Sequence, residues 1–329
     1  MNALEIKMLE RAKELLNSKK ADRIACYKKG EFYYDLTPAT FETEEELKDF
    51  VFNGFAGANL SKYMIALSKK PGITAVFLKP CDTYSFNQLL KEHRIKRENV
   101  YIIGVPCSGK LDVFKMRDLG ADGICEMQEE KGTIKVKTLY GDYTFDKKDV
   151  MLEKCLTCKG KEHKIFDEVI DYVEDYEYTP EDRFNKVKEL EGMTEEERFE
   201  FWRAELSKCI RCNACRNVCP ACSCTKCVFD NPNSGVASKA NADTFEEQNF
   251  HIIRAFHVSG RCTDCGECSR VCPQRIPLHL LNRKFIKDYN EFYGEFSAGE
   301  TSEGRTPLTS FTEKDVEPND AVKGGVKND

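Results

Sequence analysis

Apolar and polar positions follow two different rhythms in the N-terminal half of the chain. Between Met1 and Lys20, apolar residues recur at the spacing of one helical face, which predicts an amphipathic helix. Ile73–Leu78 and Val100–Val105 are instead short, continuous apolar runs that are typical of buried strands, and Ser85–His93 between them has a helical pattern. Strand, helix and strand within about 35 residues predict a βαβ unit with two neighbouring parallel strands.

Weaker patterns complete this α/β domain, which we expect to span residues 1–161. They predict short strands at Arg23–Lys28 and Glu31–Asp35, helices at Glu44–Phe52 and Leu60–Lys69, and a hairpin within Thr133–Thr144.

The rest of the chain has a different character. Residues 162–204 are rich in charge and predict an acidic helical connector, in which Thr194-x-x-Glu197 forms a capping box. Residues 205–294 predict a small α+β two-cluster ferredoxin-like domain that ends in a helix over Leu278–Phe292. Residues 295–329 have few apolar positions and predict a disordered tail.

Composition limits the function classes. The 329 residues suffice for two modest domains, and 17 cysteines, an odd number at spacings of two and three, do not suit a disulfide framework. The sequence shows neither an export signal nor an apolar stretch long enough to span a bilayer, so we expect a cytoplasmic, reduced protein without membrane insertion. A net charge of −6 argues against nucleic-acid binding.

Eight cysteines form two copies of one spacing, C-x2-C-x2-C-x3-C-P, which is the ligand run of bacterial-type [4Fe–4S] ferredoxins. In such runs the fourth cysteine binds the other cluster. The predicted ligands are Cys209, Cys212, Cys215 and Cys272 for the first cluster, and Cys262, Cys265, Cys268 and Cys219 for the second. Such clusters are often sensitive to oxygen, which suggests an anaerobic setting.

Four further cysteines could hold a third [4Fe–4S] cluster. Cys81 and Cys107 follow the two predicted parallel strands, whose carboxyl ends share one edge of the sheet, and Cys155 and Cys158 supply two more thiols at cluster spacing. The alternative is that these are buried, inert side chains.

Other cysteines leave their role open. Cys222, Cys224 and Cys227 either begin another metal site, with His251 or His257, or pack beside a cluster and tune it. Cys26 and Cys125 are expected in the core.

Lys79-Pro80-Cys81-Asp82, Gly104 with Cys107, and Cys155-x2-Cys158 resemble the beta subunits of coenzyme F420-reducing hydrogenase and F420-dependent formate dehydrogenase. That resemblance implies an α/β domain with one [4Fe–4S] cluster beside FAD, followed by a two-cluster module. It makes Lys79 and Asp82 candidates for cofactor binding. The family's Ser-Gly-Gly segment is missing, and the turn at Gly57 is the nearest candidate for a flavin contact.

The leading functional hypothesis is an electron-transfer subunit of a multisubunit oxidoreductase of the formate dehydrogenase, hydrogenase or heterodisulfide-reductase type. Its partners would be other redox subunits, a flavoprotein or a ferredoxin, and the sequence shows no catalytic site of its own. The alternatives are a flavin-containing beta subunit that itself reacts with F420 or another hydride carrier, a cluster-based redox sensor or assembly protein, and a zinc protein.

Overall fold

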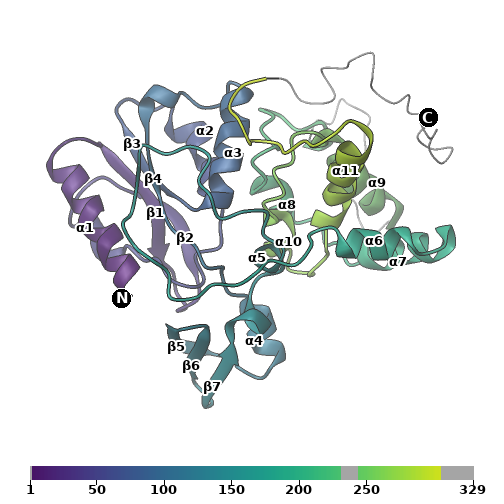
Figure 1. The fold of residues 1–329 in the computed structure, drawn as a ribbon, viewed down its shortest axis with the longest axis horizontal. Coiled ribbons are helices and arrows are strands. Elements are labelled where there is room, and N and C mark those ends of the chain that lie inside the picture. Colours follow the sequence, from purple (N-terminus) through teal and green to yellow (C-terminus); the bar gives the residue numbers. More distant parts are fainter. Residues whose placement is uncertain (1, 231–243, 305–329) are drawn as a thin grey trace. The chain divides into compact units, whose positions relative to one another are not determined.

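The computed structural model describes residues 2–230 and 244–304. The chain divides into two compact units, Met1–Arg183 and Phe184–Asp329 (Figure 1). The boundary falls inside the stretch expected as a connector. The helices of the described part are not long and apolar enough to cross a membrane.

The first unit is built around a five-stranded sheet with the order β2-β1-β3-β4-β8. Its strands are β1 (Arg23–Lys29), β2 (Leu36–Phe41), β3 (Thr74–Leu78), β4 (Val100–Gly104) and β8 (Glu168–Val169). All neighbouring pairs are parallel except β1 and β2. The predicted βαβ unit is confirmed as β3, α3 (Pro80–Lys91) and β4.

Helices cover this sheet. The first, α1 (Ala3–Asn17), and α3 lie on opposite sides of the strands (Figure 1). Every residue of β3 is buried, as its continuous apolar run predicts. The apolar face of α1, with Met8, Ala12 and Leu15, belongs to the same core, so the α/β fold class is confirmed for this unit.

A smaller antiparallel sheet follows in the chain, formed by β5 (Ile124–Glu130), β6 (Thr133–Thr138) and β7 (Asp142–Asp146). The predicted hairpin is confirmed as the pair β6–β7. With α4 (Val113–Asp118) this sheet encloses a separate core around Met116, Ile134 and Val136. Cys26 is buried as expected, whereas Cys125 on β5 is exposed.

Several predicted elements are shorter or displaced. The strand expected at Glu31–Asp35 is a turn, and the strand lies at β2, where Pro38 is tolerated because β2 is at the sheet edge. The helix expected at Glu44–Phe52 is a single turn, whereas the helix expected at Leu60–Lys69 is present over Leu60–Leu67 as two consecutive turns, η2 and α2. The short turns of this unit are η1 (Glu46–Asp49), η2 (Leu60–Tyr63), α2 (Met64–Leu67), η3 (Arg97–Asn99), η4 (Lys147–Val150) and α5 (Glu153–Leu156).

The described part of the second unit is helical. It contains α6 (Asn185–Glu191), α7 (Glu195–Ser207), α8 (Ala214–Asn217), η5 (Val228–Asp230), α9 (Thr244–His257), α10 (Glu267–Arg270) and α11 (His279–Phe292). The capping box at Thr194 is present and begins α7. Trp202 on α7 packs against both apolar clusters of this unit.

The expected connector and tail differ in part from this picture. Residues 162–183 are irregular apart from β8, and helix begins only at Asn185. Residues 295–304 form turns and bends, and the remainder of the predicted tail, 305–329, lies outside the described residues.

Candidate metal centres

The register of β3 and β4 brings Cys81 and Cys107 to equivalent positions. Leu78 pairs with Gly104, and each cysteine follows its paired residue by three positions. The Val105 N–H donates to the Leu78 carbonyl at 2.9 Å, so the two chains remain together beyond the strands. Cys81 lies in the first turn of α3 rather than in a loop. The sheet edge therefore assembles these two thiols, as the parallel topology predicts.

Cys155 and Cys158 join this edge through the segment after Cys107. The Lys110 N–H donates to Cys155 Sγ at 3.4 Å, and the Leu152 N–H donates to the Lys110 carbonyl at 2.8 Å. Because Lys110 follows Cys107 so closely, these bonds fix α5 beside the strand-end loop.

Tyr178 lies beside Cys155 and is affected by all four thiols. Its hydroxyl donates to the Cys155 carbonyl at 2.7 Å. Burial raises the pKa of Tyr178, and the charges of Cys155, Cys158, Cys107 and Cys81 raise it further. Four thiols from three segments thus lie within electrostatic reach of one hydroxyl. We call Cys81, Cys107, Cys155 and Cys158 the strand-end set.

Two of these four thiols, Cys81 and Cys155, have raised pKa values. Burial raises the pKa of Cys81 well above its ordinary value and that of Cys155 to about 11, while the nearby Lys154 opposes both shifts. Metal and cluster ligands are thiolates, so binding at this set would release protons.

Lys79 and Asp82 form a buried pair beside Cys81. Lys79 Nζ lies 2.9 Å from Asp82 Oδ2, 2.8 Å from the Tyr27 hydroxyl and 2.7 Å from the Ala58 carbonyl. Both side chains are buried, so this is not the surface salt bridge that such a sequence pair most often makes. The three donors of the Lys79 ammonium already have partners within the protein.

Gly57 also contacts a residue next to the strand-end set. Its carbonyl accepts a bond from Lys154 Nζ at 2.7 Å. The helix that follows, η2, is a single turn capped by Asn59. Because η2 continues directly into α2 (Met64–Leu67), a helical segment over Leu60–Leu67 follows Gly57, and the flavin contact expected at Gly57 stays a prediction.

The two ferredoxin-type runs have matching backbones. Arg211 and Asp264 occupy the same position in each run and have left-handed conformations, with φ of 52° and 55°. Asn213 and Gly266, two positions later, are also left-handed and precede the short helices α8 and α10. The two runs thus share the same pattern of left-handed turns between their cysteines.

The fourth cysteine of each run approaches the other run. The Cys219 thiol is among the charges that raise the pKa of Cys262 and Cys268, and Cys272 is among those that raise the pKa of Cys215, in each case after burial. This is the proximity that a crossed ligand arrangement needs. Cys212 is the exposed member of the first run.

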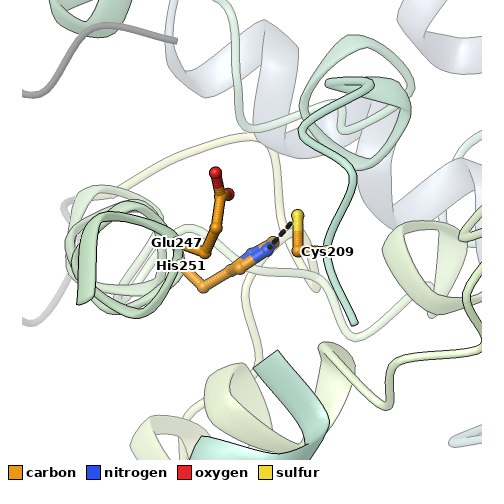
Figure 2. Close-up of side chains that lie close together, drawn as sticks. All are labelled: Cys209, Glu247 and His251. Carbon is orange, nitrogen blue, oxygen red and sulfur yellow. Dashed lines mark hydrogen bonds between the residues drawn. The ribbon is translucent and has the colours of Figure 1, made fainter. Parts of the chain in front are cut away.

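A zinc site would require closely spaced ligand atoms. Tetrahedral Zn–S bonds of ~2.3 Å hold thiolates about 3.8 Å apart. Among the described residues, one set of three ligand atoms lies within 4.8 Å, and it comprises Cys209, Glu247 and His251 (Figure 2). No three cysteine thiols in the same ranges come as close.

His251 approaches Cys209 rather than the later cysteines. Figure 2 shows Glu247 and His251 on one helix, α9, with His251 Nε2 3.2 Å from Cys209 Sγ. His257 is exposed. Cys222 approaches Cys219 and lowers its pKa to about 6, and Cys224 is exposed. The described residues thus show no group that unites Cys222, Cys224 and Cys227 with a histidine.

Three charged residues of this unit were not predicted from the sequence. They are Arg211, Glu247 and Arg254, all of them buried. The available signal was their spacing, since Glu247, His251 and Arg254 recur at four and three positions on one face of a helix inserted between the runs.

Comparison with known proteins supports the resemblance stated above. Residues 205–276 match the 4Fe-4S dicluster domain family. The chain is 26% identical over 333 aligned positions to the F420-dependent formate dehydrogenase subunit beta of Methanocaldococcus jannaschii, covering 84% of this chain and 87% of that protein. It is 26% identical over 282 positions to the F420-dependent formate dehydrogenase 1 subunit beta of Methanococcus maripaludis, covering 66% and 72%.

A solved structure, the xenon-derivatised F420-reducing [NiFe] hydrogenase complex from Methanosarcina barkeri, contains a chain that aligns with 14% identity and a TM-score of 0.38 over 46% of this chain and 58% of that one. The chain thus carries a 4Fe-4S dicluster domain behind an α/β unit, and its similarity to F420-dependent formate dehydrogenase beta subunits is confirmed.

Proposed function

We propose that this protein is the iron–sulfur electron-transfer subunit of a cytoplasmic, multisubunit oxidoreductase of the F420-dependent formate dehydrogenase or hydrogenase type. It would relay single electrons through three [4Fe–4S] clusters. Two would be bound by the ferredoxin-type runs with crossed fourth ligands, and one by the strand-end set. The third cluster is supported by the register of β3 and β4, which places Cys81 and Cys107 at equivalent positions, and by the bond from the Lys110 N–H to Cys155 Sγ, which brings α5 to the same sheet edge.

The protein's own contribution is to place the ligands and to shape their surroundings. Clusters of this kind exchange one electron at a potential that hydrogen bonds, charge and burial set. At the strand-end set, the Lys110 N–H donates to Cys155 Sγ, and Lys154 adds positive charge near Cys81 and Cys155. Both features favour thiolate over thiol.

Domain limits follow from the same proposal. The α/β domain would be residues 1–161, the connector 162–204, the dicluster domain 205–294 and the tail 295–329. The match at 205–276 lies within the third of these. Other redox subunits would bind the protein and supply the substrate site.

The test is the content of iron, sulfide and flavin after anaerobic purification. Three clusters predict about twelve irons and twelve sulfides per chain. About eight irons would contradict the strand-end cluster, and zinc in place of iron would contradict the function as a whole.

A second function is favoured by the names of the curated relatives. A beta subunit that itself exchanges a hydride with F420 would need bound FAD, with Lys79, Asp82 and Gly57 as the candidate contacts. The flavin measurement separates the two proposals. Stoichiometric FAD together with reduction of F420 by the purified complex would favour the second, and full cluster content without flavin would favour the first.

A further inference from the structure

Helix α9 is inserted between the two cysteine runs and turns a polar face inward. Glu247, His251 and Arg254 recur at four and three positions, so they share one face. All three side chains are buried. Polar groups on a buried helical face require partners, and two of the three have them in the protein.

Glu247 and His251 are accounted for by the first run. Glu247 forms an ion pair of 3.3 Å with Arg211, and His251 contacts Cys209. Arg211 also lies over the Phe250 ring at 3.8 Å.

Arg254 is different. Its side chain is 3% exposed, and within the described residues its Nε, Nη1 and Nη2 atoms have no hydrogen-bond partner. Arg211 and Arg283 are buried to the same degree in this unit, yet each pairs with a carboxylate, Glu247 at 3.3 Å and Asp264 at 2.8 Å. A buried guanidinium without an anion is strongly unfavourable.

The negative charges that act on Arg254 belong to thiols of both runs. Burial by itself would lower the pKa of Arg254, but Cys268, Cys219, Cys215 and Cys222 outweigh it and raise that pKa. Two of these, Cys268 and Cys219, are predicted ligands of the second cluster, and Cys215 of the first. The missing anion is thus expected where the cysteines converge.

We propose that Arg254 is the counter-charge of the two clusters of the dicluster domain. Its guanidinium stabilises the additional negative charge of a reduced cluster, and it acts most on the cluster of Cys262, Cys265, Cys268 and Cys219. This inference rests on the proposed iron–sulfur function. It assigns α9, which the cysteine spacing does not require, to tuning the reduction potentials.

The experiment compares Arg254→Gln and Arg254→Lys in the full chain purified anaerobically, with Arg203→Gln as a control. Arg203 is an exposed arginine of α7 paired with Glu200, so its loss should change neither iron content nor potential. The measurements are iron per chain and a redox titration followed by the electron paramagnetic resonance of the reduced clusters.

We expect Arg254→Gln to weaken the electron affinity of one cluster by about tenfold or more, which corresponds to a potential lower by ~59 mV for one electron. Arg254→Lys should stay closer to wild type because it keeps the charge. His251→Leu identifies the clusters, since His251 contacts Cys209 of the first run and its loss should shift the potential of the other cluster.

Each possible result either supports or contradicts the role proposed for Arg254. Unchanged potentials in Arg254→Gln with full iron, or equal shifts in the Gln and Lys variants, would overturn the proposal. If Arg254→Gln loses its clusters, retention by Arg254→Lys supports it and loss in both contradicts it. Absence of iron from the wild-type protein would instead refute the proposed function, which keeps the two failures distinct.

Discussion

The two units place their cysteines in different ways. In the second unit the cysteines belong to two short sequence runs. In the first unit Cys81 and Cys107 come to one edge of the sheet because strands β3 and β4 pair in register. The ferredoxin-type runs are local and share left-handed turns, at Arg211 and Asn213 and again at Asp264 and Gly266. The strand-end set needs the whole sheet. The same ligand chemistry can therefore be encoded by spacing or by topology, and the two should fail under different changes.

Among the tests of this contrast, Cys81→Ser should have the largest effect. Removing one of four ligands should cost the strand-end cluster, so iron should fall from about twelve to about eight per chain. The resonance of the two ferredoxin-type clusters should be unchanged. Cys125→Ser, which changes an exposed cysteine outside both sets, should keep all the iron. Full iron in Cys81→Ser would show that Cys81 is not a ligand.

The second-largest effect is expected from a substitution at the sheet edge that leaves every cysteine in place. It should destabilise the strand-end site without affecting the ferredoxin-type runs. Lys79→Met leaves Asp82 buried and unpaired, which should lower the free energy of unfolding of the first unit by about 3–5 kcal/mol. Under urea, this variant should release about four irons at a lower concentration than wild type does.

The control for that experiment is Lys28→Met. Lys28 pairs with Asp49 at 3.5 Å on the surface, so its loss should cost at most about 1 kcal/mol. If the ferredoxin-type clusters were released together with the strand-end cluster in Lys79→Met, the two sites would not be independent.

A smaller effect is expected at Tyr178. Tyr178→Phe removes the hydrogen bond to the Cys155 carbonyl and should cost about 0.5–1.5 kcal/mol. Because the hydroxyl bonds to Cys155 and the charges of the four thiols act on it, the resonance of the strand-end cluster should change while the other two remain as they were. A change confined to the resonance of the ferredoxin-type clusters would show that Tyr178 does not influence the strand-end cluster.

The smallest expected effect is a pH dependence at His163. Its Nε2–H lies 3.2 Å from the carbonyls of Leu78 and Val105, just before the strand-end set. Burial lowers the pKa of His163 below 6.5, against the opposing effect of those carbonyls and of Asp82. The unfolded chain then binds a proton before the folded one, so this contribution is complete above pH 6.5 and is lost as the pH falls.

Urea unfolding at pH 7.5 and pH 5.5 measures that loss. Wild type should lose up to about 1 kcal/mol more than His163→Gln, which keeps an N–H donor but does not titrate. Equal losses in the two proteins would rule out His163 as the titrating group.

Features set by sequence spacing or strand order could be predicted from the sequence, whereas features set by tertiary packing could not. The sequence alone predicted the cysteine runs, the βαβ unit and the meeting of Cys81 with Cys107, because spacing and strand order are local or topological properties. It did not predict that Cys81 lies on a helix, that β2 contains Pro38, or that the helix expected at Glu44–Phe52 is a single turn, since these depend on packing and on position at the sheet edge.

The charged residues around the thiols were the hardest to foresee. Lys79 and Asp82 were predicted from the sequence as candidates for cofactor binding, and only the fold shows that they are buried with Tyr27 and Ala58. Arg254 gave no signal beyond its place on one face of α9. A charge becomes informative when burial deprives it of water, and burial is a property of the tertiary structure.

The register between Leu78 and Gly104 has a consequence for the order of assembly. The three closely spaced cysteines of a ferredoxin-type run lie together on any short flexible segment, so iron can begin to bind there during synthesis. Cys81 and Cys107 come together only after β3 and β4 have paired. Maturation of the strand-end cluster would then wait for a folded sheet, and the bound cluster would hold those two strands in place afterwards.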